Sequence, residues 1–246
     1  MRIWRTAAFV VPPLLGPCLA NRLSASKVGS LPSLTGACDA ILRGHASTVS
    51  CAEQLRDGRV LTGSLDTNLR VFDLETAKCE LTLAGHTKGV LKVLQLDGSL
   101  IASASNDGTV RIWDVGRSSC LHELQGHTAP ISTVIQVGGK LLSASLDGTL
   151  RLWSLANYEC MHVMRHKQTE RDTLRYSGAV FCATVLKDGR VVSGSKDKTL
   201  KIWDPNQNWN CTEVLKRHRS GVWCVVQLEN GTIVSGGNDM KVHMWR

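Results

Sequence analysis

One phrase recurs five times along the chain and restricts the fold more than any other feature of the sequence. It reads SASNDGTVRIW at residues 103–113 and returns with substitutions elsewhere. The aromatic ends of the five copies are Phe72, Trp113, Trp153, Trp203 and Trp245. Their separations are 41, 40, 50 and 42 residues. A period of about 40 residues predicts an array of similar structural units.

Two further positions keep phase with the aromatic residue. An aspartate lies six residues before the aromatic residue in every copy. A histidine lies 20 or 21 residues before that aspartate in the first, second, third and fifth copies, and 31 residues before it in the fourth copy. The histidine and aspartate pairs are His45 and Asp66, His86 and Asp107, His127 and Asp147, His166 and Asp197, and His218 and Asp239. Because the aspartate spacing holds in all five copies and the histidine spacing in four of them, the segments are true repeats.

Each repeat reads as four short strands. In the second copy, apolar and β-branched runs alternate with turn signals at Asp97-Gly98 and Asp107-Gly108, which is typical of hairpins. A further strand is expected just before each histidine, the first of them at residues 38–42. No room remains for a helix, so the repeats predict antiparallel meanders.

The Gly-His, Ser-x-Asp and Trp-Asp signals at these spacings resemble the WD repeat, whose members form β-propellers of four-stranded antiparallel blades. The resemblance covers residues 38–246 and implies an all-β WD40 propeller. Propellers of this family usually have seven or eight blades, so five repeats indicate either an unusually small ring or part of a truncated seven-bladed propeller. The strand at 38–42 and the strand ending at Trp245 have phases that would let them share one blade and close a ring.

Serine, histidine and aspartate also form hydrolase triads, but a triad is needed once, beside an oxyanion hole. Here the trio recurs at the same phase, which favours an architectural role, and we expect no catalytic residue and no enzyme activity. The resemblance instead implies a hydrogen-bonded network in which tryptophan donates to serine, serine bonds histidine and histidine bonds aspartate. The implied sets are Trp113, Ser105, His86 and Asp107; Trp153, Ser145, His127 and Asp147; and Trp203, Ser195, His166 and Asp197.

The first and last repeats depart from this pattern. Phe72 has no indole N–H to donate to Ser64, and Gly237 has no hydroxyl to place between His218 and Trp245. Each lost link would cost on the order of 1 kcal/mol. We therefore expect the first and last repeats to open before the middle ones.

The cysteines follow the repeat. Five of the nine share one position before the histidine: Cys38, Cys79, Cys120, Cys160 and Cys211. Equivalent positions lie a blade apart, and no CxxC spacing is present, so we expect neither disulfides, nor a metal site, nor a cofactor. Small, buried, reduced thiols are expected, which suits the cytoplasm or the nucleus.

Residues 1–37 do not fit the repeat. They contain four basic residues and no acidic one, as in a disordered or targeting leader, and their apolar run is too short for a membrane span. Of the net charge of +8, half comes from this leader. The repeats therefore carry an ordinary surface charge, which argues against a nucleic-acid footprint.

Two sets of residues are candidates for partner binding. Those directly before the repeat aspartates should surround the central opening on the loop face: Leu65, Asn106, Leu146, Lys196 and Asn238. In the fourth repeat, His166 precedes the first strand valine by 14 residues, against four in most copies. Long loops on a rigid scaffold often carry function, and the residues of interest in this one are Lys167, Arg171, Arg175 and Tyr176.

These features predict a scaffold that binds protein or peptide partners on the loop face, within a multiprotein complex. The repeat sequences are similar to those of propellers that receive substrates for ubiquitin ligases of the F-box type, and to those of related signalling adaptors. This is an analogy at the level of fold. The alternative is a propeller that binds RNA or anionic lipid through basic loops.

Overall fold

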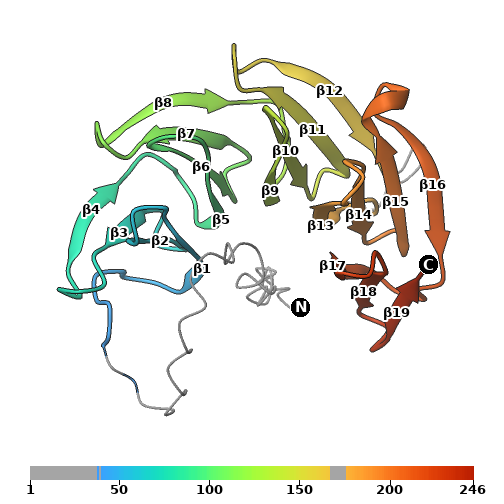
Figure 1. The fold of residues 1–246 in the computed structure, drawn as a ribbon, viewed down its shortest axis with the longest axis horizontal. Coiled ribbons are helices and arrows are strands. Elements are labelled where there is room, and N and C mark those ends of the chain that lie inside the picture. Colours follow the sequence, from blue (N-terminus) through green and yellow to red (C-terminus); the bar gives the residue numbers. More distant parts are fainter. Residues whose placement is uncertain (1–37, 39, 167–175) are drawn as a thin grey trace, which may run out of the picture.

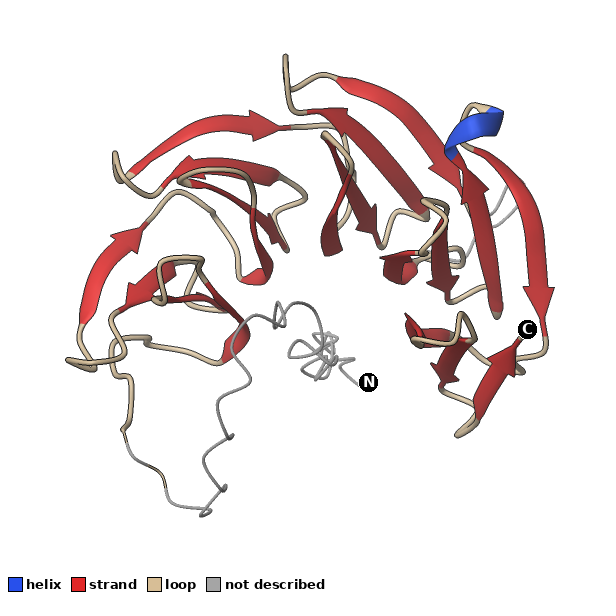
Figure 2. Ribbon diagram, in the orientation of Figure 1, coloured by secondary structure: helices blue, strands red, loops and turns tan. Residues whose placement is uncertain are grey.

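The structure, a computed structural model, describes Cys38, residues 40–166 and residues 176–246. Nineteen strands form five separate antiparallel sheets (Figures 1 and 2). In chain order the strands are β1 (Val49–Gln54), β2 (Val60–Ser64), β3 (Leu69–Phe72), β4 (Cys79–Leu83); β5 (Val90–Gln95), β6 (Leu100–Ser105), β7 (Val110–Asp114), β8 (Ser119–Leu124); β9 (Ile131–Val137), β10 (Lys140–Ser145), β11 (Thr149–Ser154), β12 (Cys160–Arg165); β13 (Val180–Val185), β14 (Val191–Ser195), β15 (Thr199–Asp204), β16 (Asn210–Lys216); and β17 (Val222–Gln227), β18 (Ile233–Gly237), β19 (Val242–Trp245).

Each sheet is a meander in which strands that follow one another in the chain are neighbours, as in the order β1-β2-β3-β4. Figure 1 shows the five sheets as blades around an arc, with the first strand of each blade innermost and the last one outermost. A single turn of 3₁₀ helix, Pro205–Gln207, is the only helical element in the described part of the chain. The all-β propeller architecture expected from the sequence is confirmed.

Turn chemistry explains the hairpins. The turn between the first two strands of a blade contains a glycine with positive φ, for example 95° at Gly58 and 87° at Gly189. A residue with a Cβ is strained in this conformation, whereas glycine adopts it freely. The glycine of the turn signal, which is Asp-Gly in three repeats, Gly-Gly in the third and Asn-Gly in the fifth, therefore sets where the first hairpin of each blade reverses.

The hydrophobic core lies between blades. Trp113, on β7, packs in one cluster with Leu61, Leu69 and Leu83 of the preceding blade, and Trp153, on β11, belongs to the corresponding cluster one blade further on. A single blade cannot bury its own faces, so each one is stabilised by its neighbours, as in other repeat proteins.

The two ends of the arc differ from the sequence expectation. The strand expected at residues 38–42 is wrong: its described residues are not in a strand, and Ile41 is 62% exposed. The fifth sheet, β17-β18-β19, has three strands. A strand needs a neighbour to pair its backbone groups, and Figure 1 places β19 at the opposite end of the arc from this segment. The described chain is therefore an arc of a propeller, and the closed five-bladed ring does not form.

Candidate functional site

A hydrogen-bonded brace lies beneath the loops of each repeat. In the third repeat, His127 Nδ1 lies 2.8 Å from a carboxylate oxygen of Asp147, and its Nε2 lies 2.8 Å from Ser143 Oγ. The indole Nε1 of Trp153 donates to the same Ser143 Oγ at 2.8 Å. The ionised carboxylate of Asp147 can only accept, so His127 Nδ1–H donates to it, and Nε2 of the neutral imidazole accepts from the Ser143 hydroxyl. The aspartate thus fixes the direction of the chain of bonds, and the indole N–H donates to a lone pair of the same serine oxygen.

The serine of this brace is not the one assigned from the sequence. In the second repeat Ser103, and not Ser105, lies between Trp113 and His86, at 2.8 and 2.7 Å. The corresponding serines are Ser143 in place of Ser145 and Ser193 in place of Ser195. The register explains the error. Trp113 pairs with Ile101, so Ser103 is two residues away along the strand and Ser105 is four, roughly 13 Å at the rise of a strand.

The serines assigned to the brace from the sequence, Ser105, Ser145 and Ser195, make other hydrogen bonds. Ser105 Oγ donates to the carbonyl oxygens of Lys88 and Gly89 and accepts the backbone N–H of Asp107 at 3.1 Å. Ser145 and Ser195 make the same kind of contacts. They tie the aspartate turn to the loop that enters the blade.

The first and fifth repeats also depart from expectation. In the fifth, Ser235 Oγ completes the brace, 2.9 Å from both Trp245 Nε1 and His218 Nε2. The missing link expected at Gly237 is therefore wrong, because Gly237 occupies the Ser105-type position. In the first repeat, Thr62 Oγ1 lies 2.8 Å from His45 Nε2 and also bonds the Arg70 carbonyl oxygen at 3.3 Å.

The aspartates of the braces are held ionised. Burial alone would raise the pKa of Asp107, but hydrogen bonds from His86 and Thr109 outweigh burial and hold that pKa well below its usual range. Bonds to backbone N–H groups and to His45 likewise lower the pKa of Asp66 to about 2 against its burial. Burial lowers the pKa of His166, which favours the neutral imidazole. A neutral histidine that donates to a carboxylate is the state the brace requires.

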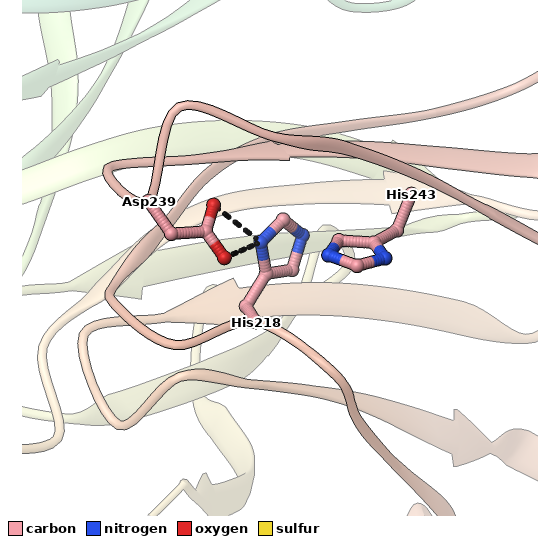
Figure 3. A group of neighbouring side chains, drawn as sticks. All are labelled: His218, Asp239 and His243. Carbon is pink, nitrogen blue, oxygen red and sulfur yellow. Dashed lines mark hydrogen bonds and ion pairs between the residues drawn. The ribbon is translucent and has the colours of Figure 1, made fainter.

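One group of side chains resembles a metal site (Figure 3). His218, Asp239 and His243 each offer a ligand atom within 4.8 Å of the others. However, His218 Nδ1 bonds both oxygens of Asp239 at 3.0 Å, and its Nε2 bonds Ser235. A metal ion would have to displace the brace of the fifth repeat, so we assign His218 and Asp239 to that brace.

His243 has a different surrounding from its counterparts. Its ring packs edge-to-face on His218, with ring centroids 4.4 Å apart, and its Nε2 is buried without a hydrogen-bond partner among the described residues. The other repeats place a long basic side chain here: Arg70, Arg111, Arg151 and Lys201.

Above the braces, the residue that precedes each repeat aspartate makes an equivalent backbone hydrogen bond in all five repeats. Their N–H groups donate to carbonyl oxygens of the loop that enters the same blade, at 2.8 or 2.9 Å. The bonds run from Leu65 to Thr48, Asn106 to Gly89, Leu146 to Pro130, Lys196 to Ala179 and Asn238 to Gly221. Leu65, Lys196 and Asn238 are exposed, and Asn106 and Leu146 are half-buried. The scaffold thus fixes the backbone at five equivalent positions, while the side chain at that position differs between repeats.

The long loop of the fourth repeat lies mostly outside the described residues. This holds for Lys167, Arg171 and Arg175. Tyr176 is described: it is half-buried, has a φ of 68°, and its carbonyl oxygen accepts the N–H of Ala179 at 3.1 Å. Its role in partner binding stays a prediction.

The cysteines are less buried than expected. No disulfide joins any of the eight described cysteines, and only Cys51 is buried. The expectation failed because the shared position starts the outermost strand. There Cys79, Cys120 and Cys160 lie under an arginine guanidinium at 3.6 to 3.7 Å from Sγ rather than in the core.

Comparison with known proteins agrees with this architecture. The family profile described as "WD domain, G-beta repeat" matches residues 36–73, 77–114, 118–154, 169–204 and 209–246. Among solved structures, the crystal structure of the WD40 beta propeller domain of Doa1 matches with a TM-score of 0.67 and 24% identity. At this identity the likeness shows the fold alone. The match covers 82% of this chain but 65% of that one.

Comparison with curated proteins found no match. The five profile matches nevertheless coincide with the five blades and together cover most of the sequence. The chain therefore belongs to the WD-repeat family of β-propellers.

Proposed function

We propose that this protein is a non-catalytic scaffold that binds protein or peptide partners on its loop face. The observation that carries the proposal is the shared backbone bond before each repeat aspartate, which holds different side chains at equivalent places. Rigid presentation reduces the entropy lost when a partner binds. Propellers of the family commonly serve protein interaction, which supports the same role.

The polar residues that recur in the repeats do not favour catalysis. Each brace histidine has both ring nitrogens in hydrogen bonds, one to an aspartate and one to a serine or threonine hydroxyl. A general base needs a nitrogen that can reach a substrate. The braces therefore fit a structural role, and recognition falls to the side chains above them.

We further place the protein in a multiprotein complex in the cytoplasm or nucleus, as a substrate receptor of a ubiquitin ligase or a signalling adaptor. The similarity of its repeat sequences to those of such propellers supports this narrower role. The eight described cysteines form no disulfide, which fits a reducing compartment.

The test is a set of paired charge variants read by cross-linking mass spectrometry of the purified protein with its partners. Leu65→Asp and Lys196→Glu alter the loop face. Leu228→Asp and Lys187→Glu are matched controls, because they lie in hairpins between the first two strands of their blades, on the opposite face, and Leu65 and Leu228 are similarly exposed, at 39% and 41%.

We expect the loop-face variants to lose most cross-links to partners and the controls to keep them. Equal losses from both faces, with circular dichroism showing intact folding, would refute a binding surface on the loop face.

A second candidate function is the binding of RNA or of anionic lipid. The observation in its favour is the set of exposed basic residues on the loop face of the last two repeats, Lys196, Lys198 and Arg219. No helix in the described ranges is long and apolar enough to cross a membrane. Binding that falls steeply with added salt would favour this function, whereas salt-tolerant binding of a defined peptide would favour the first.

A further inference from the structure

The two ends of the arc are complementary to each other. At one end, the outer edge of β19 has no neighbouring strand among the described residues. At the other end, Cys38 and residues 40–43 precede the first blade without joining a sheet. In the four complete blades the corresponding edge is occupied by β4, β8, β12 and β16.

The unpaired segment has the sequence pattern of those outer strands. Each outer strand carries a cysteine and, four residues later, a large apolar residue, and Cys38 and Leu42 repeat this spacing. In the complete blades the apolar residue is mostly buried, with 1% exposure at Leu83 and 3% at Leu124. Leu42 is half-buried and Ile41 is 62% exposed. The segment therefore has the side chains of an outer strand without the contacts of one.

The complete blades also define a register. The aromatic residue of the third strand pairs with the cysteine of the outer strand, as Trp113 does with Cys120, and a bulge follows. The same pairing appears as Phe72 with Cys79, Trp153 with Cys160 and Trp203 with Cys211. In this register Ala40 would face Met244, and Leu42 would face Val242.

Apolar exposure is concentrated at these two ends. The five most exposed large hydrophobic residues in the described chain all belong to the first or last repeat: Met240 at 97%, Val242 at 71%, Met244 at 65%, Ile41 at 62% and Val49 at 49%. A groove of about 430 Å³ runs beside β19, lined by residues that include Leu215, Met244 and Trp245. Unpaired strand edges with apolar side chains readily pair with another chain.

The geometry of the crossover selects the source of the strand. In a complete blade the outer strand leads within three residues into the brace histidine of the next blade, as from Leu83 to His86. The segment before His45 can therefore reach only a sheet that stands directly beside the first blade. In Figure 1 no described strand stands at that place, and the chain's own fifth blade lies at the far end of the arc.

We propose that the fifth blade of a second copy of this chain stands beside the first blade and receives residues 40–43 as its fourth strand. This contact joins two different surfaces. Each copy that joins leaves one free segment and one free edge, so association continues head to tail as concentration rises.

The test is site-directed disulfide trapping between two differently tagged copies of the full chain. One copy carries Ala40→Cys and the other Met244→Cys, which the proposed register brings together. The matched control replaces the second copy with Met240→Cys, because Met240 is more exposed but lies four residues out of register, too far for a disulfide. The unsubstituted chain gives the background from native cysteines.

We expect a cross-linked species with both tags from the first mixture, at least fivefold above the control mixture and the background. Equal trapping of the control would overturn the proposal, because it would reflect exposure alone. A chain that carries both Ala40→Cys and Met244→Cys and cross-links only within itself would overturn the second copy as the occupant.

Light scattering provides a measurement without new cysteines. We expect the mass to rise with concentration above the 26.8 kDa of one chain. The paired variant Val242→Lys and Met244→Lys should stay at that mass, while Met240→Lys should associate like the unsubstituted chain. A chain that is monomeric at every concentration reached would overturn the proposal.

Discussion

The first and third repeats place the same histidine and aspartate in the same geometry, yet they complete the brace differently. In the third, the Ser143 hydroxyl accepts the indole N–H of Trp153 and bonds His127, which bonds Asp147. In the first, Phe72 has no donor, and the Thr62 hydroxyl is shared between His45 and a backbone carbonyl. The comparison teaches that the indole does more than fill the core, because it adds a hydrogen bond that holds the hydroxyl beside the histidine.

The largest effect is expected from removing the shared hydroxyl of the third repeat. Ser143→Ala leaves both the indole N–H of Trp153 and Nε2 of His127 buried without a partner. The expected loss in free energy of unfolding is about 2–4 kcal/mol, because each unsatisfied buried group costs about 1–3 kcal/mol. Thr62→Val is the matched change in the first repeat. It leaves only His45 Nε2 without its side-chain partner, so the loss in free energy of unfolding should be about half as large. Urea unfolding measures both, and equal losses would contradict the comparison.

A smaller effect is expected when the third repeat is made to resemble the first. Trp153→Phe removes the indole donor and some buried area, for an expected loss of about 1–3 kcal/mol. Urea unfolding measures this loss, and ¹⁵N NMR of His127 should show the Nδ1–H tautomer with and without the indole, because the ionised Asp147 accepts that proton. A change of tautomer in this variant would show that the indole, and not the aspartate, sets the direction.

Acid should weaken both repeats, because the pKa values of Asp66 and Asp147 are below the unfolded value near 3.9. A group with a lowered pKa stabilises the fold above its unfolded pKa and loses that contribution as the pH falls. We expect the melting temperature to drop between pH 4 and pH 2. Asp147→Asn should flatten this slope, and an unchanged slope would refute an ionised Asp147.

The smallest effect is expected near neutrality, from the fourth repeat. Because burial lowers the pKa of His166, protons bind the unfolded chain first as the pH falls below about 6.5. Stability should therefore begin to decline there, before the carboxylates titrate. His166→Gln should remove this decline in stability. The measurement is the difference in melting temperature between pH 7.5 and pH 5.5.

Sequence reasoning succeeded where the signal is periodic and local. The five repeats, the four-stranded meanders of the first four blades and the histidine and aspartate pairs follow from spacing and turn residues. It failed on the serine. Ser103 and Ser105 are two residues apart on one strand, so both point to the same face, and only the pairing of Ile101 with Trp113 decides which hydroxyl the indole reaches. The same register made Ser235, not Gly237, the residue that matters in the fifth repeat.

The sequence by itself determined the repeat, the order of strands within a blade and the residues available for each brace, because these depend on contacts between neighbours in the chain. The tertiary structure decided which hydroxyl joins tryptophan to histidine, and that Cys38 and residues 40–42 are not in a strand, in an arc whose ends stay apart. A strand forms only where a partner edge is within reach. For this segment the matching edge lies about 200 residues away along the sequence, so its state depends on how the blades are arranged in space.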